Sequence, residues 1–169
     1  MLNACTRRID LLFGLRHLAR AFDLRCARVV GVDRAALDWA IANGIDHGVW
    51  CPAGRRSEDG PIPVRYRLAE TQSSDYPERT RLNVADSDAT LVRNCGALDG
   101  GTAKTVTIAQ KTGKPHLVID LDGDVDSSAV AIRSWLAEAR PEVLNVAGPR
   151  ESKRPGVGAR ALSVLQAVV

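Results

Sequence analysis

The sequence of 169 residues has few aromatic side chains and little net charge. Phe, Trp and Tyr together make up only 4% of the chain and are widely scattered, so they offer no stacking surface for single-stranded bases. The formal net charge is +3, and the arginines are spread along the chain rather than gathered in one basic block. Because nucleic-acid binding depends on clustered positive charge, we expect no nucleic-acid partner.

Cysteine is also sparse, and its four positions lie far apart at Cys5, Cys26, Cys51 and Cys95. The chain has no Cys-x-x-Cys pair and no histidine at ligand spacing, which argues against a structural zinc site. We therefore expect no bound metal. The cysteines are interpreted as reduced thiols of a cytoplasmic protein that fill small spaces in its core.

No apolar run of the sequence is long enough to span a bilayer. The run at 11–15 follows two arginines but ends at Arg16, which is too early for the apolar region of a secretory signal. We expect a soluble protein in the cytoplasm with no membrane partner.

Apolar runs typical of strands alternate with segments of helical periodicity, in a length that suits one domain with a single core. One helix is predicted over 31–44, with Asp33 as its N-cap and Gly44 as its stop. A second helix is predicted over 127–141, ending before Pro141. Strands are predicted at 47–52, 89–94, 116–122 and 143–149.

The segment after Gly101 has an ambiguous pattern, because residues 105–108 alternate like a strand. A crossover between parallel strands at 89 and 116 needs about a dozen residues, and Gly113-Lys114-Pro115 is a strong helix stop. We therefore predict a helix from Thr102 to Thr112. Strands separated by helical crossovers predict an α/β protein, a Rossmann-like three-layer α/β/α domain with a mainly parallel sheet.

The stretch LDGGTAKT at 98–105 joins a predicted strand to this helix. Ligands of open α/β sheets bind beyond the carboxyl ends of the strands, where glycines let the backbone approach an anion and the next helix directs free N–H groups at it. Gly100, Gly101 and Thr102 are therefore candidate phosphate-binding residues. The alternative stays open that Asp99-Gly100 is merely a turn and Thr102 an ordinary N-cap.

Two further loops are predicted at the same end of the sheet. Residues 147–156 follow the last strand and either hold an anion by charge-assisted bonds or form a solvated charged loop. The candidate residues in this loop are Gly148, Pro149, Arg150, Glu151, Ser152 and Lys153. Residues 51–63 follow another strand, and their length without helical pattern predicts a functional loop.

Several long motifs, taken in order, resemble the molybdenum carrier protein family: GVDRAALDWAIANGIDHGVWCPAGRRSEDGPIPVRYRLAET, DYPERTRLNVADSDATLV, LDGGTAKT, KPHLVIDL and VLNVAGPRESKRPG. The resemblance covers most of the chain, from about residue 31. It implies a Rossmann-like fold related to the LOG-type nucleotide-binding proteins, and binding of molybdenum cofactor (molybdopterin), a pterin with a phosphate, for storage or delivery.

The resemblance also adds Gly31, Asp33 and Arg34, at the start of the first helix, to the candidate cofactor-binding residues. Molybdoenzymes are the implied recipients of the cofactor, and we expect a homo-oligomer. The ligand that the residues themselves predict is a phosphate-bearing small molecule.

The front of the chain departs from the family pattern. Family members begin with a strand and a Ser-Gly-Gly-Gln-Thr-Gly-Val-Asp-Arg loop, whereas Cys26-Ala27-Arg28-Val29-Val30 precedes Gly31 here, so one phosphate-binding Gly-Gly is missing. Residues 1–25 form a divergent segment ahead of a single Rossmann-like domain at 26–169. They are interpreted as an added helix or an altered start, because Leu11, Leu15, Leu18 and Phe22 stand at helical spacing.

A nucleotide hydrolase is the alternative function, because LOG-type relatives include phosphoribohydrolases. Their Pro-Gly-Gly-x-Gly-Thr-x-x-Glu motif, laid on residues 101–105, places Thr105 where the glutamate should stand. Without that carboxylate the natural acid-base group is lost. We therefore expect a binding protein without catalytic residues. Asp33, Asp86 and Asp88 would be the remaining carboxylates of the cleft, although Asp33 and Asp86 are more simply a helix cap and a turn residue.

Overall fold

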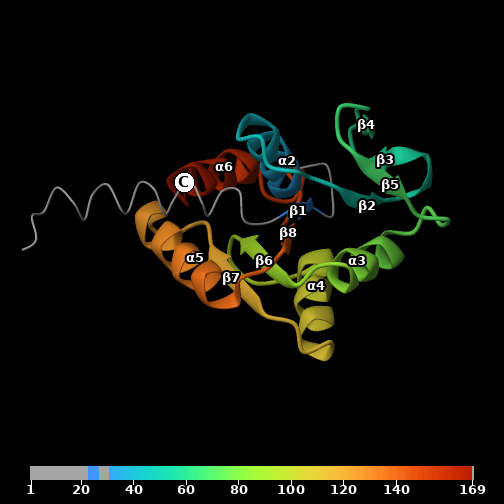
Figure 1. Ribbon diagram of the computed structural model, residues 1–169. Helices are drawn as coiled ribbons and strands as arrows, with labels where there is room; N and C mark the ends of the chain where they lie inside the picture. Colours follow the sequence, from blue (N-terminus) through green and yellow to red (C-terminus); the bar gives the residue numbers. More distant parts are fainter. Residues whose placement is uncertain (1–22, 27–30, 169) are drawn as a thin grey trace, which may run out of the picture.

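The protein is described by a computed structural model that covers residues 23–26 and 31–168. Its centre is a four-stranded parallel sheet in the order β1-β8-β6-β7 (Figure 1). The strands are β1 (Asp23–Cys26), β6 (Ala89–Asn94), β7 (His116–Asp120) and β8 (Val143–Ala147). Three of them coincide with predicted strands, and the predicted parallel sheet is confirmed.

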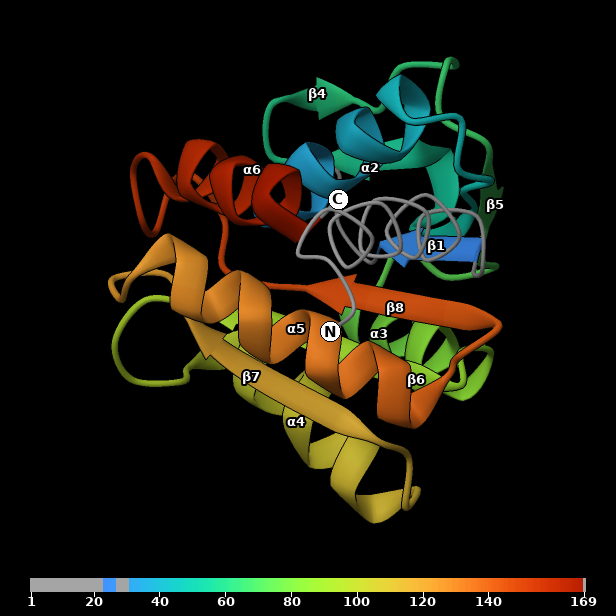
Figure 2. The ribbon, with the colours of Figure 1, turned by 60° about the vertical axis from the view of Figure 1, so that its left-hand side comes forward.

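Helices cover both faces of this sheet (Figure 2). On one face α6 (Val157–Val168) packs against both α2 (Val32–Ala42) and α5 (Val125–Ala139). On the other face α3 (Tyr76–Ala85) packs against α4 (Gly100–Lys111). The steps from β6 to β7 and from β7 to β8 run in opposite directions across the sheet, so right-handed crossovers place α4 and α5 on opposite faces. The predicted three-layer domain is confirmed.

The two faces of the sheet bury separate apolar clusters, because strand side chains alternate between the faces. Leu91 and Leu144 point into the larger cluster beneath α2, α5 and α6. Val92 and Ala147 point the other way and meet Val106 of α4. Burying a leucine fully, as at Leu91, stabilises the fold by about 2 kcal/mol.

A side unit of short strands links the two faces at the β1 end of the sheet. β2 (Val49–Cys51) pairs in parallel with β5 (Leu68–Glu70), and between them lie a 3-10 turn (Ala53–Arg55) and the hairpin of β3 (Arg56–Ser57) and β4 (Gly60–Pro61).

The prediction of a strand near 47–52 is confirmed, but its place in the main sheet was wrong. The Asn83 side chain on α3 accepts from the Trp50 N–H at 2.9 Å and donates to the Trp50 carbonyl at 3.1 Å. A side-chain amide thus occupies the edge of β2 that another strand would have needed.

The start of α2 differs from the prediction. Asp33 is not the N-cap: the helix begins at Val32 with Gly31 in the cap position, and Asp33 lies in the first turn with a 1% exposed surface. A Cβ at Gly31 would lie 2.8 Å from the Pro149 carbonyl oxygen and from the Glu151 nitrogen. This close approach fixes where the helix begins. Gly44 follows the C-cap residue, as its prediction as a stop requires.

The helix predicted after Gly101 is confirmed, but it begins two residues earlier than predicted. Asp99 holds the N-cap position with extended backbone, so Thr102 is a first-turn residue and its interpretation as an N-cap was wrong. Helix α5 also begins early, at Val125, because the Asp124 carboxylate accepts the Ser127 N–H at 2.8 Å and caps it there.

Helices α3 and α6 were not predicted. The buried face of α3 is largely polar and consists of Arg79, Thr80, Asn83 and Val84, so its sequence lacks an apolar stripe. Helix α6 follows a loop of charged residues, prolines and glycines that masks its start.

The predicted N-terminal helix falls mostly outside the described residues. Its last three positions, 23–25, are in β1, which corrects the prediction there. Among the described helices, none combines the length and the apolar composition that crossing a membrane requires. Cys51 and Cys95 are buried free thiols, as predicted, and burial raises the pKa of each.

Candidate anion-binding site

Three loops meet beyond the carboxyl ends of the sheet strands, as the sequence predicts. The Lys153 Nζ atom lies 2.9 Å from the Asp99 carboxylate, which joins the β8–α6 loop to the β6–α4 loop. Arg150 forms an ion pair with Glu58, and the Ser152 hydroxyl donates to Glu58 at 2.8 Å. These contacts bring the 51–63 segment onto the same loop.

The N-terminus of α4 carries the candidate phosphate-binding glycines. The first N–H of this region that bonds to a backbone carbonyl is that of Ala103, which donates to Asp99 at 3.0 Å. The preceding N–H groups, of Gly100, Gly101 and Thr102, lie in the first turn, where a helix supplies no carbonyl partner. We call these N–H groups together with the Lys153 ammonium the α4 anion site.

The Lys153 ammonium lies beside the N-terminus of α4. Its Nζ atom lies 3.2 Å from where a Cβ would stand on Gly100, so a larger residue there would crowd the ammonium. A cation at the positive end of a helix dipole is unfavourable by itself and requires a counter-ion. Asp99 supplies that counter-ion, and its hydrogen bond from Lys153 lowers the pKa of the Asp99 carboxyl.

Two other candidate glycines act by close packing. A Cβ on Gly148 would lie 2.4 Å from the Arg93 carbonyl oxygen and 2.6 Å from Val32 Cγ2. A Cβ on Gly31 would lie 2.8 Å from two backbone atoms of the β8–α6 loop. These contacts hold the start of α2 against the β8–α6 loop, so the two glycines shape the site through the backbone.

Between α4 and α2 lies a small cavity of about 10 Å³ lined by Asp33, Arg79, Thr80, Gly101, Thr102, Thr105, Ala147 and Gly148. This volume holds about one water molecule. A ligand larger than an ion therefore cannot enter between the helices and would lie over the first turn of α4.

A larger pocket of about 560 Å³ is lined in part by Glu151 and Ser152 of the β8–α6 loop. We call it the side pocket; its lining residues include Gly31, Arg34, Asp38, Glu58, Asp59 and Glu151. Arg34 lies 2.7 Å from Asp59, and the pKa of Asp59 is lowered mainly by the Ser57 hydroxyl and then by Arg34. Carboxylates outnumber cations in this pocket, which distinguishes it from the α4 anion site.

The charged side chains of the β8–α6 loop are mostly bonded within the protein. The Glu151 carboxylate accepts the N–H of Gly156 at 2.5 Å and that of Gly158 at 3.1 Å, which caps the start of α6. Arg150 is held by Glu58 and lies 5.3 Å from the centre of the Tyr76 ring. Of the predicted loop residues, Lys153 is the one whose charge lies at the N-terminus of α4.

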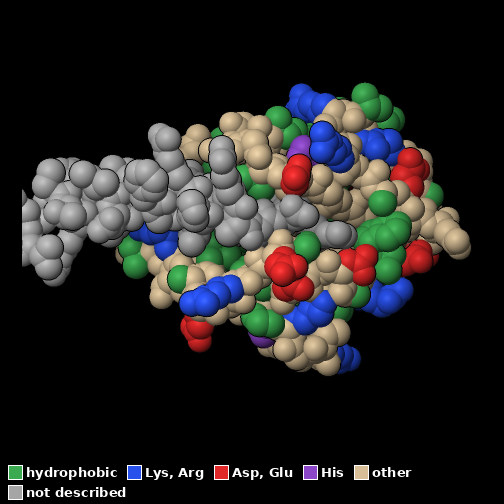
Figure 3. Space-filling view, in the orientation of Figure 1, with side chains coloured by type: hydrophobic (Ala, Val, Ile, Leu, Met, Phe, Trp, Pro, Cys, Tyr) green, Lys and Arg blue, Asp and Glu red, His purple; other side chains and the backbone are tan. Residues whose placement is uncertain are grey.

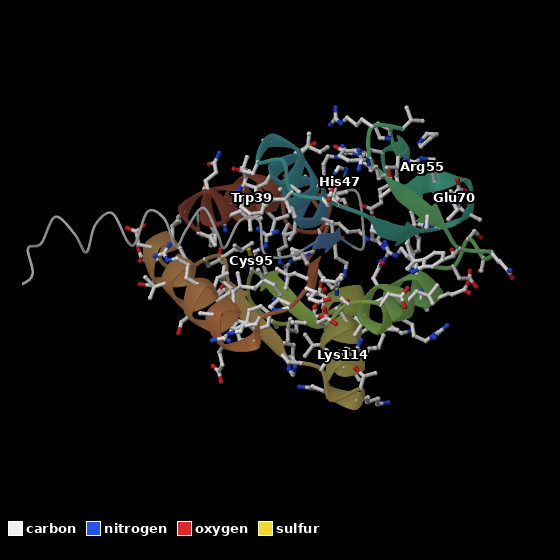
Figure 4. All side chains as sticks on the ribbon, in the orientation of Figure 1. Trp39, His47, Arg55, Glu70, Cys95 and Lys114 are labelled. Atoms are coloured by element: carbon white, nitrogen blue, oxygen red, sulfur yellow. The ribbon has the colours of Figure 1, made fainter. Side chains whose placement is uncertain are left out.

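The 51–63 loop is held by Arg55 from within it and by Glu70 of β5, both labelled in Figure 4. Arg55 donates to the carbonyl groups of Ile62, Pro63 and Tyr66. Glu70 accepts the Gly54 N–H at 2.7 Å. Arg55 thus braces the loop, and the loop reaches the site through Glu58.

On the face shown in Figure 3, acidic and basic side chains are interspersed.

The remaining carboxylates that the sequence offered are not in the cleft, apart from Asp33. Asp86 accepts from the Trp50 indole at 2.6 Å, and Asp88 accepts the Val143 N–H at 2.8 Å. Val143 begins β8 and Asp88 precedes β6, so this contact lies at the amino ends of the strands. The prediction that Asp86 and Asp88 lie in the cleft was therefore wrong. Thr105 is buried and donates to the Gly101 carbonyl at 2.9 Å.

Two fully buried arginines were missed by the sequence analysis. Arg93 on β6 donates to the Ala161 carbonyl at 2.7 Å and so connects the sheet to α6. Arg79 on α3 lines the small cavity. Arginine in a strand or on a polar helix is normally a surface residue, so the local pattern carried no signal of its burial.

In the part of the chain that the structure describes, no three metal-ligating side chains gather.

Comparison with known proteins shows the family of the chain. A solved structure from Syntrophus aciditrophicus SB, named "Putative molybdenum carrier protein", has a TM-score of 0.84 and 40% sequence identity, over 89% of this chain and 96% of that one. No curated protein matches the chain. The sequence profile of the circularly permutated YpsA SLOG family matches residues 29–169, and the resemblance stated above is confirmed. The chain belongs to the circularly permutated YpsA SLOG family.

Proposed function

We propose that this protein binds molybdenum cofactor and carries it without transforming it, with the cofactor's phosphate held at the α4 anion site. One observation carries the proposal: the Lys153 ammonium lies beside the first turn of α4, 3.2 Å from the Cβ position of Gly100, in the turn that contains the N–H groups of Gly100, Gly101 and Thr102. The name of the Syntrophus protein, a molybdenum carrier, supports the choice of cofactor.

A phosphate at this point would accept from the backbone N–H groups and from Lys153 together. Each charge-assisted hydrogen bond of this kind contributes about 1.5 to 3 kcal/mol. The phosphate would also neutralise a cation that otherwise faces the positive end of the helix. In the structure, Asp99 neutralises Lys153, so Asp99 would compete with the phosphate for this lysine.

The pterin part of the cofactor needs a volume that the small cavity does not offer. The side pocket, at about 560 Å³, lies within the usual range for small-molecule sites. Its lining includes Glu151 and Ser152, which directly precede Lys153 of the α4 anion site, and its carboxylates accept hydrogen bonds from the amino edge of a pterin. We place the pterin there, next to Arg34 and Glu151.

The carrier role rests on the position of Thr105. Where related phosphoribohydrolases have a glutamate, this buried hydroxyl bonds within its own helix and has no acid-base capacity near pH 7. Delivery to molybdoenzymes is part of the proposal, as is a cytoplasmic location, which the free thiols of Cys51 and Cys95 support.

The test is to produce the full chain in a host that makes molybdenum cofactor. Molybdenum is then measured by mass spectrometry, and the pterin by the fluorescence of its oxidised form. We expect both to copurify with the wild-type protein and to fall about tenfold or more in Lys153→Gln, which loses one charge-assisted bond. Gly101→Asp, which adds a repelling carboxylate to the first turn, should have at least the same effect.

The matched control is Lys104→Gln, at an exposed lysine on the same helix, which should retain the cofactor. Wild-type protein without bound pterin, or Lys153→Gln with full loading, would contradict the proposal.

A further inference from the structure

Strand β7 is an edge strand of the main sheet, paired with β6 alone among the described strands (Figure 2). The Thr90 N–H donates to the Pro115 carbonyl at 2.9 Å, and the Leu121 N–H donates to the Asn94 carbonyl at 2.7 Å. Because hydrogen bonding alternates along a strand, the odd-numbered positions of β7 bond to β6. The residues whose N–H and C=O groups point away from the sheet are His116, Val118 and Asp120.

The side chains of these outward residues share one face of the sheet. Val118, at the centre of β7, is 40% exposed, whereas Ile119 on the opposite face is 7% exposed and belongs to the core. An exposed edge with an apolar centre is a template for pairing with another strand, which proteins usually block with lysine, proline or a bulge. The strand His116–Asp120 contains neither lysine nor proline.

We propose that β7 pairs in antiparallel fashion with β7 of a second copy of this chain, about a two-fold axis at Val118. In this register Val118 lies opposite its own copy, and His116 lies opposite Asp120 of the second copy on both sides of the axis. The outward groups are those that form hydrogen-bonded pairs in an antiparallel ladder. An imidazole directly across such a pair from a carboxylate offers it a hydrogen-bond donor, and polar pairs of this kind stabilise the ladder.

The strand's own sequence favours this partner and this direction. A parallel in-register pairing would place Asp120 against Asp120, which is repulsive. Moving the antiparallel register by two residues would leave one of the three outward residues without a partner inside the strand.

The pairing would make one sheet continuous through both copies and leave both binding sites open. The α4 anion site lies beyond the carboxyl ends of the strands, whereas the proposed contact runs along the side of β7. This inference therefore stands independently of the proposed cofactor.

The first experiment measures the dimer dissociation constant of the full chain by sedimentation equilibrium. We expect a dimer, and we expect Val118→Lys, which sets two ammonium groups against each other on the axis, to raise the dissociation constant about tenfold or more. The matched control is Val64→Lys, the same change at a valine that is 91% exposed in the segment between β4 and β5. A monomeric wild type, or a Val118→Lys protein with unchanged affinity, overturns the inference.

A charge exchange tests the register. His116→Glu would set two carboxylates against each other across the axis and should weaken the dimer, whereas the double variant His116→Glu/Asp120→Lys sets opposite charges across it and should recover the dimer. Amide hydrogen exchange gives a direct readout: the N–H of Val118 should become more protected as protein concentration rises, while an exposed amide of the 51–63 loop should not change. A double variant as weak as the single one, or concentration-independent exchange at Val118, overturns the register.

Discussion

The Lys153 ammonium and the Asp99 carboxylate lie 2.9 Å apart at the N-terminus of α4. Each comes from a loop that follows a different strand of the sheet, β8 for Lys153 and β6 for Asp99. Both side chains are about half exposed, so the pair itself contributes little to stability. The pair matters because it holds the Lys153 ammonium beside the first-turn N–H groups of α4.

Replacing Asp99 with Asn should strengthen the binding of inorganic phosphate or pyrophosphate. The change removes the anion that competes for Lys153 and leaves the first-turn N–H groups of α4 in place. We expect affinity to rise several-fold, about 1 kcal/mol, measured by isothermal titration calorimetry. Asp126→Asn, in the first turn of α5, is the control and should have no effect. Weaker binding by Asp99→Asn would show that Asp99 supports the site instead.

Replacing Gly31 with Ala should destabilise the fold strongly. Its φ of 67° is unfavourable for alanine, and the new Cβ would lie 2.8 Å from two backbone atoms of the β8–α6 loop. We expect a loss of about 3 kcal/mol in the free energy of unfolding, measured by urea denaturation. Gly44→Ala has nearly the same φ, 65°, with open space around the Cβ, and should cost only about 1 kcal/mol. Equal losses would mean that the close approach at Gly31 does not matter.

The Asp124 cap of α5 predicts a pH-dependent contribution to stability. The Ser127 N–H lowers the pKa of Asp124 in the folded state, so its stabilising effect is present above the unfolded pKa and is lost as pH falls through the folded one. Asp124→Ala should therefore be less stable than wild type at pH 7, and the difference should vanish in strong acid.

The control for this cap is Asp75→Ala. Asp75 holds the N-cap position of α3, but its side chain accepts no capping bond. Its removal should change stability less than the removal of Asp124 at pH 7. Urea unfolding at several pH values checks both variants, and a difference for Asp124→Ala that persists unchanged in acid would contradict the cap.

The protein should release no adenine from AMP. Thr105 stands where a hydrolase would have its glutamate, and its hydroxyl is committed to the Gly101 carbonyl. Chromatography of a long incubation with AMP, beside a sample without protein, measures the product. Free adenine above the blank that disappears in Asp33→Asn would point to Asp33, the buried carboxylate of the small cavity, as the group that replaces the glutamate.

The sequence alone was sufficient for the elements with a clear local pattern. The β-branched run at 89–94 is β6 with the predicted bounds, and the stop at Gly113-Lys114-Pro115 correctly favoured a helix over a strand in the segment before it. The loops that converge at the carboxyl ends of the strands were also predicted. These features depend on side-chain periodicity and backbone preferences within a few residues, which the sequence states directly.

Tertiary structure decided which charges are available and which are consumed. Glu151 caps α6, and Arg150 pairs with Glu58. Arg93 is a buried donor to the Ala161 carbonyl. Of the charged residues predicted in the β8–α6 loop, Lys153 alone has its charge at the start of α4. The order of strands, with β8 between β1 and β6, was likewise set by packing. Each of these outcomes depends on groups that are distant in the sequence and meet only once the helices close over the sheet, so no local pattern contains them.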